Sequence, residues 1–228
     1  MKKLLKILGI IVVIIITALT IGYFVLNESL PEGQAGAEAD AMAERMMAAM
    51  NHDAWEATEE VSWTFRGTNS YKWFKNEDKV EIRLGNSPTV YLNTKLGSAA
   101  VQADGSNPNE TPELIAKAID NFNNDSFWLA APFKAFDPGT ERSIVELKDG
   151  RTGLMVTYTS GGSTPGDSYV WILDENDRPV AIKMWVQILP LGGMEFTWEN
   201  YMTLSSGALV AQDHKLFGSM NVDLTNIK

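Results

Sequence analysis

The sequence predicts an α+β protein in which a curved antiparallel sheet with covering helices follows one transmembrane helix. Three observations support this prediction. An uncharged apolar run extends from Ile7 to Leu26 (ILGIIVVIIITALTIGYFVL). Two later segments, 37–51 and 111–123, place apolar residues at the 3.6-residue spacing of amphipathic helices. Elsewhere after Trp55 the spacing is two, which is typical of β-strands.

The apolar run has the length and flanks of a membrane anchor. At about 1.5 Å of rise per residue it spans about 30 Å, the thickness of a bilayer's hydrocarbon core. Lys2, Lys3 and Lys6 precede the run, and no basic residue follows it before Arg45. The positive-inside bias places residues 1–6 in the cytoplasm and the rest of the chain outside. We therefore expect an anchor at 7–26, a linker at 27–36 that contains Pro31, Gly33 and Gly36, and an extracytoplasmic domain at 37–228.

A cleavable signal peptide is the alternative interpretation of this segment. The apolar regions of signal peptides usually have about 7 to 15 residues and end at a small-x-small site. The run here is longer, and Ala35-Gly36-Ala37 lies well past its end. The chain has no cysteine, which excludes lipidation at a lipobox and excludes disulfides. We expect a single-pass protein of the bacterial inner membrane whose C-terminal domain faces the periplasm.

The charge of the outer part excludes one class of partner. Three of the 19 basic residues and none of the 29 acidic ones precede Asn27, so the remainder carries 16 basic and 29 acidic residues, a formal charge of −13. Phosphate backbones need clustered Lys and Arg, so nucleic acid is not an expected partner. Anionic headgroups should also repel the general surface of the domain, although the anchor holds it near them.

The strands predicted after residue 55 form a meander with short connections, which favours antiparallel pairing. They are expected at 61–66, 79–84, 89–93, 143–148, 154–159, 168–174, 180–189, 194–204 and 208–217. Several are apolar on both faces: Val170 and Ile172 alternate with Trp171, and Met184 alternates with Trp185. A sheet with one wet face would alternate apolar and polar residues. Either both faces are covered, or one face lines an apolar cavity.

The sequence contains no recognisable reactive site. His52 and His214 each lie beside an aspartate, and without cysteine they do not form a typical zinc site. The start of a calcium loop at Asp174 is interrupted by Arg178 and Pro179. Pairs of carboxylates are expected by chance among 29 acidic residues. We therefore predict no catalytic residue, no metal site and no cofactor, and we do not expect an enzyme.

The aromatic residues are the more informative set. Seven tryptophans are present, and each can be a core residue or part of an apolar lining. The sequence does not say which face each one takes. The candidate ligand-binding residues are Trp63, Phe65, Trp73, Trp128, Trp171, Met184, Trp185, Phe196 and Trp198.

The order of elements resembles that of the LolA/LolB-like superfamily of periplasmic lipoprotein carriers, which includes the RseB-type sensors. A helix, a strand with the sequence VSWTF, a middle helix and a long meander follow one another. The best local match is SYVWILDENDRPVAIKMWV (168–186), followed by EFTWENY (195–201). The resemblance implies an unclosed half-barrel with helices across an apolar cavity that receives acyl chains or a segment of a partner. This chain departs from it in its uncleaved anchor.

Two functions follow as hypotheses. The first is a membrane-anchored, non-enzymatic envelope protein that binds a lipid or lipoprotein acyl chain in a half-barrel cavity. The second is a sensory or structural protein-interaction module with a solid aromatic core and no small ligand. Its protein partner is unknown, and the acidic exterior would suit a basic one.

Overall fold

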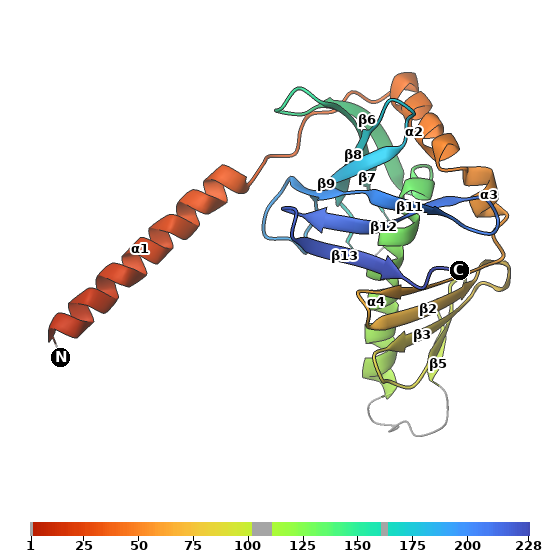
Figure 1. The fold of residues 1–228 in the computed structure, drawn as a ribbon, viewed down its shortest axis with the longest axis horizontal. Helices are drawn as coiled ribbons and strands as arrows, with labels where there is room; N and C mark the ends of the chain where they lie inside the picture. Colours follow the sequence, from red (N-terminus) through yellow and green to blue (C-terminus); the bar gives the residue numbers. More distant parts are fainter. Residues whose placement is uncertain (1, 102–110, 161–163) are drawn as a thin grey trace.

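The computed structural model describes residues 2–101, 111–160 and 164–228. A long N-terminal helix, α1 (Lys2–Leu26), projects away from a domain that contains all the other elements (Figure 1). Its segment Lys6–Leu26 is long and apolar enough to cross a membrane, and it is not buried against the rest of the chain. The isolation of so many apolar side chains from the domain agrees with the predicted anchor.

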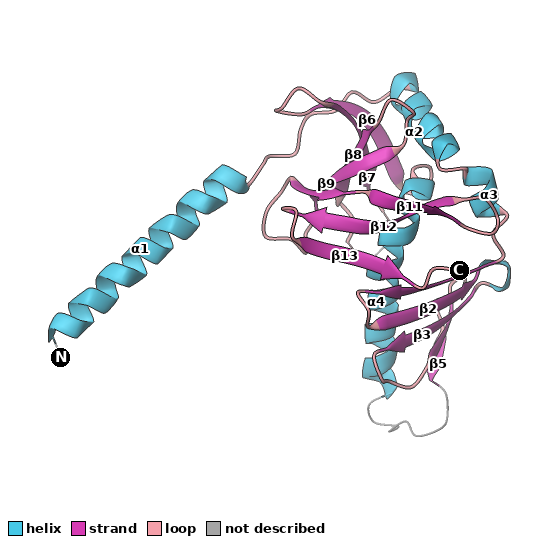
Figure 2. Cartoon of the chain, in the orientation of Figure 1, coloured by secondary structure: helices cyan, strands magenta, loops and turns pink. Residues whose placement is uncertain are grey.

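The domain is built on a large, open, curved antiparallel sheet (Figure 2). Thirteen strands belong to it within the described residues, in the order β5-β4-β3-β2-β1-β13-β12-β10-β9-β8-β7-β6, with β11 pairing to β12. Their bounds are β1 Glu60–Phe65, β2 Asn69–Phe74, β3 Lys79–Leu84, β4 Val90–Asn93, β5 Ala99–Val101, β6 Thr140–Glu146, β7 Thr152–Tyr158, β8 Ser168–Leu173, β9 Pro179–Trp185, β10 Met194–Thr197, β11 Glu199–Thr203, β12 Leu209–Leu216 and β13 Met220–Thr225.

The first strand, β1, and the last strand, β13, lie next to each other in the middle of the sheet. β13 pairs with β1 at Thr64↔Thr225 and Phe65↔Leu224, and the backbones of Ser62 and Lys228 exchange two hydrogen bonds. The C-terminal segment therefore joins the early strands to the later meander. Strands β2, β5 and β13 were not predicted, and the expected strand 194–204 is divided at Trp198 into β10 and β11.

Three helices accompany the sheet. α2 (Ala37–Ala49) packs against β6 and β7, and a left-handed residue, Asn51, separates it from the short α3 (His52–Glu56). α4 (Thr111–Ala130) crosses the sheet and contacts β3, β4, β5 and β12 (Figure 1). It continues beyond the predicted end at Asn123 because Trp128 and Leu129 bury their side chains against the sheet. Two 3₁₀ turns, Lys75–Glu77 and Ala131–Lys134, complete the elements.

Strands β7 to β9 bury apolar side chains on both of their faces. The main core lies between the sheet and helices α2 and α4, and it includes Trp171 and Ile182. A smaller cluster lies on the opposite face of the same strands. It consists of Val145, Leu147, Met155, Val170, Ile172 and Ala181, with Trp185 packed beside it.

Residues 27–36, the predicted linker, run along this second face and are hydrogen-bonded to the sheet. The Glu28 carboxylate accepts a 2.7 Å hydrogen bond from Lys183, and the Glu28 carbonyl accepts one of 2.9 Å from Trp185 Nε1. Gln34 then pairs with Ile144 at the free edge of β6. Gly33 is required for this path, because a Cβ there would lie 2.1 Å from Ser143 Oγ. The segment is exposed to solvent over most of its length but is tied to the sheet at several points.

Candidate functional site beneath helix α4

The interior between α4 and the sheet contains a cluster of aromatic rings, which we call the tryptophan–histidine cluster. Its members are Trp128 of α4, Trp171 of β8, Phe196 of β10, Trp198 and His214 of β12. Trp128 stacks on Trp198 with ring centroids 6.0 Å apart, and Trp198 lies 3.9 Å from His214. Trp171 meets Trp198 edge to face at 5.0 Å. Rings from one helix and four places on the sheet thus share one interior.

A second group of rings, the β1–β2 cluster, lies nearer the start of α4. It consists of Trp63, Tyr71, Trp73 and Phe122. Trp63 stacks on Tyr71 at 4.8 Å, and Phe122 of α4 contacts Trp73 edge to face at 5.6 Å. The period-two spacing of β1 and β2 turns these rings toward α4. α4 therefore covers aromatic rings in both parts of the sheet.

Several polar atoms in this interior have no partner. Within the described part of the chain, Trp63 Nε1, Trp198 Nε1 and both ring nitrogens of His214 are buried without a hydrogen bond. A buried donor that is not hydrogen-bonded costs about 1–3 kcal/mol, so such atoms are uncommon in native interiors. Two indole N–H donors and one imidazole are thus available to a polar atom that enters between α4 and the sheet.

Burial keeps His214 neutral. Desolvation lowers the pKa of its imidazole to about 3. Backbone groups of Thr197 and Trp128 and the carboxylate of Asp213 lie near enough to favour protonation, although none of them forms a hydrogen bond of good geometry with the ring. The loss of hydration outweighs them because the side chain is fully buried. At neutral pH the His214 imidazole is therefore uncharged and packs among the rings of the cluster.

A buried carboxylate holds the middle of α4 on the sheet. Asp125 accepts hydrogen bonds from the Tyr71 hydroxyl and from Asn69 Nδ2, the latter at 3.0 Å. Asn69 also donates to Asn121 of α4 at 3.2 Å. Burial and the neighbouring carboxylate raise the pKa of Tyr71, so its hydroxyl remains a donor. The contact between α4 and β2 therefore combines these directional hydrogen bonds with the ring contacts of Phe122.

The structure brings eight of the nine candidate residues together. All of them belong to the main core or pack against it. They are Trp63, Phe65, Trp73, Trp128, Trp171, Met184, Phe196 and Trp198. Trp185 is the exception, because it lies on the opposite face beside Glu28 and Lys183. Sequence reasoning did not identify His214 or Asp125 as members of this interior, although a histidine inside the apolar strand 208–217 was a usable signal.

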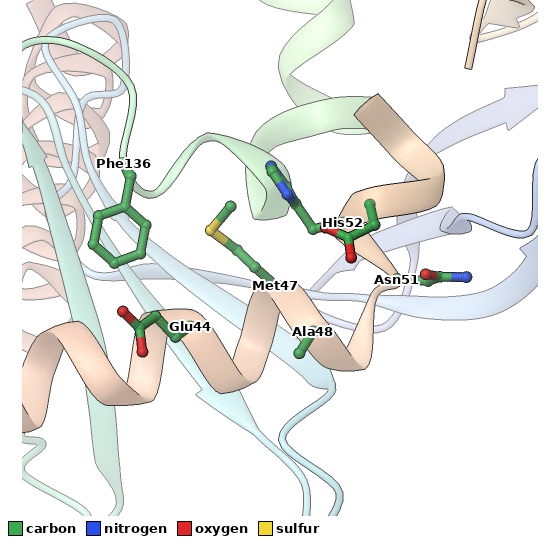
Figure 3. A pocket seen from close by; sticks show the side chains of 7 residues that line it. Glu44, Met47, Ala48, Asn51, His52 and Phe136 are labelled. Atoms are coloured by element: carbon green, nitrogen blue, oxygen red, sulfur yellow. The ribbon is translucent and has the colours of Figure 1, made fainter. Parts of the chain in front are cut away.

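An open hollow of about 400 Å³ lies elsewhere, at the corner between α2 and α3 (Figure 3). Met47 and Phe136 give it apolar walls, and Glu44 lies at its side (Figure 3). Asn51, His52, Asp53 and Ala48 complete its lining. None of the nine candidate residues lines it. The hollow is thus lined by both apolar and acidic side chains.

Acidic side chains elsewhere on the sheet form ion pairs. Among the residues that the structure describes, no three His, Asp or Glu side chains come close enough together to hold a metal ion. Arg151 bridges Asp149 and Glu195, and its hydrogen bonds lower the pKa of Asp149 to about 2, so these carboxylates act as ion-pair partners. In comparisons with known proteins, no protein-family model matches the chain and no curated protein matches it either.

Proposed function

We propose that this chain is a membrane-anchored, non-enzymatic protein of the bacterial inner membrane that binds an apolar ligand between its sheet and α4. The ligand class is a lipid or the acyl chain of a lipoprotein, and the architecture is a half-barrel of the LolA/LolB/RseB-like kind. One observation carries the proposal: α4 covers aromatic rings in both parts of the sheet, and two of the buried indole donors among the described residues, Trp63 Nε1 and Trp198 Nε1, have no hydrogen-bond partner.

Movement of α4 away from the sheet would open an apolar space above the aromatic rings. Phe122 and Trp128 fill the space over Trp63 and Trp198. An acyl chain that replaces them would bury comparable apolar area, which is the main driving force for binding such ligands. The ester carbonyl of a lipid could accept from an indole N–H, so the ligand would also satisfy a buried donor.

The ion pair between Lys183 and Glu28 favours an uncleaved anchor over a cleaved signal peptide. Lys183 is only 7% exposed, and its ammonium is paired with Glu28. Cleavage after Ala37 would remove Glu28 and leave this charge buried without its carboxylate, which is unfavourable. A tethered protein cannot carry a ligand across the periplasm. Hand-over at the inner membrane, or sensing of the ligand, is the role that fits the tether.

A disulfide that locks α4 on the sheet tests the proposal. The chain has no cysteine, so Asn69→Cys with Asn121→Cys introduces one pair at a position where the two side chains already touch. We expect the full-length protein in detergent to bind a fluorescent fatty acyl probe when the pair is reduced. Oxidation should abolish binding, because α4 can no longer leave the interior. Asn69→Cys alone, under the same oxidant, controls for the substitution.

Two results would contradict the proposal. One is equal binding of the probe by the oxidised and the reduced double variant, which would place the ligand outside the α4 interface. The other is an empty wild-type protein, with no probe response and no lipid released on solvent extraction or seen in native mass spectrometry.

A protein-interaction module without a small ligand is the second candidate. The rings beneath α4 are already closely packed against one another, and the hollow beside α2 combines apolar walls with Glu44 and Asp53. Crosslinking in intact envelopes would favour this function if it captured one protein partner while the purified protein contained no lipid. Substitution of Glu44 and Asp53 by Gln and Asn should then weaken the crosslink.

A further inference from the structure

Two loops leave the sheet at the same end. β10 pairs with β12 in antiparallel register at Phe196↔Leu216. Residues 186–193, which lead into β10, and the turn 217–219, which follows β12, therefore emerge next to each other. Figure 1 shows the β12–β13 turn at the end of the sheet that faces α1.

Both loops expose large apolar side chains. Ile188 is 68% exposed, Phe217 is 70% exposed, and Met220, which begins β13, is 56% exposed. The sequences VQILPLGGM (186–194) and FGSMNV (217–222) contain no charged residue, in an outer part with a formal charge of −13. Soluble surfaces seldom gather large apolar side chains in this way unless they meet an apolar partner.

The outer end of α1 is hydrogen-bonded to one of these loops. Asn27, the first residue after α1, accepts a 2.8 Å hydrogen bond from the Gly192 amide through its side chain. The Glu28 amide donates to the Gly192 carbonyl at 2.9 Å. Only glycine permits this approach, because a Cβ on Gly192 would lie 2.6 Å from the Glu28 carbonyl. The loop is thus held at the level where the anchor ends.

We propose that residues 186–193 and 217–220 form a membrane-contact face that enters the interfacial region of the bilayer in which α1 is anchored. The inference rests on the proposed anchoring by α1, which identifies the partner: an anchored α1 holds the loop at Gly192 beside the bilayer. Aliphatic and aromatic side chains partition into the headgroup and acyl boundary, and the lack of charge removes the repulsion that anionic lipids exert on the rest of the domain.

Single cysteine labels on the full-length chain in phosphatidylcholine nanodiscs test this inference. Ile188→Cys and Phe217→Cys carry an environment-sensitive fluorophore on the proposed face. Leu96→Cys is the matched control, since Leu96 is 76% exposed in the turn between β4 and β5, at the far edge of the sheet. Ile14→Cys reports on the anchor. We expect lipid-borne nitroxide to quench the labels at 188 and 217 several-fold more than the label at 96, and aqueous iodide to show the reverse order.

The outcomes distinguish the membrane-contact face from the membrane anchor. A label at 14 that is quenched by lipid, together with labels at 188 and 217 that behave like the one at 96, overturns the contact face and leaves the anchor intact. Labels at 188 and 217 that are shielded from both quenchers also overturn it, since a protein would then cover the face. A label at 14 that lipid does not reach contradicts the anchor, and the contact face with it.

Discussion

At the scale of single residues, His214 is the group whose ionisation opposes the fold. Its pKa in the folded chain is about 3, against an ordinary value of 6.5. The unfolded chain therefore binds a proton below pH 6.5 that the folded chain does not bind. The free energy of unfolding must fall as the pH decreases through this window, and the contribution is absent above it.

The His214→Leu variant isolates this effect. We expect the free energy of unfolding of the wild type to fall by about 1.4 kcal/mol per pH unit, relative to the variant, between pH 6 and pH 4. At pH 7 the variant should be as stable as the wild type or more stable, because leucine removes two unpaired ring nitrogens at similar volume. Urea unfolding at several pH values measures the difference. His52→Leu, at the other and partly exposed histidine, is the control, and an equal pH slope in wild type and His214→Leu would contradict the assignment.

Asp125 provides the second residue-scale prediction. Asp125→Ala leaves the buried Tyr71 hydroxyl without its acceptor and removes one of the two acceptors of the Asn69 amide, so we expect a loss of about 2–4 kcal/mol in the free energy of unfolding. Asp120→Ala, on the exposed side of the same helix, should change it by less than about 0.5 kcal/mol. Denaturant unfolding compares the two variants. Equal effects of the two substitutions would show that Asp125 does not hold α4.

At the scale of elements, the sequence predicts where most strands lie, but it does not predict which face of each strand lies against α4. The meander from β6 to β12 agrees with the predicted segments because a two-residue period and turn residues are local signals. Strand β9 is apolar on both faces, and its alternation alone does not say which face meets α4. Lys183 was the informative residue, because a lysine within IKMW marks the face that needs an acidic partner. That partner, Glu28, lies 155 positions earlier in the sequence, so no local pattern identifies it.

The end of α4 and the three missed strands have the same kind of cause. The sequence FWLAAPFKAF has no clear helical period, and α4 extends through its start because Trp128 and Leu129 find contacts on distant strands. β13 is short and polar in alternation, and it is fixed by pairing with both β12 and β1. Such elements are defined by tertiary contacts that local propensity does not contain.

At the scale of the whole molecule, the anchor and the domain are connected through the second face of the sheet. The chain passes from α1 along this face, pairs with the edge of β6 at Gln34 and then enters α2 on the other face. Residues 27–36 thus link α1 to this face of the sheet through the contacts of Glu28, Gly33 and Gln34.

Removal of the Glu28 carboxylate should therefore loosen the whole arrangement. We expect Glu28→Ala to lower the free energy of unfolding of the full-length protein by about 1–3 kcal/mol, because Lys183 becomes a buried charge without its carboxylate, while partial exposure of Glu28 moderates the loss. Amide hydrogen exchange at Gly192 and Gln34 should accelerate in the same variant. Glu32→Ala, at an exposed glutamate of the same segment, should leave both measurements near the wild-type values.

Combining Glu28→Ala with Lys183→Met should recover most of the lost stability, since no buried charge then remains. If the double variant is as unstable as Glu28→Ala alone, the ion pair is not what holds residues 27–36 to the sheet, and the orientation of the domain at the membrane must depend on the backbone contacts of Gly192 and Ile144 instead.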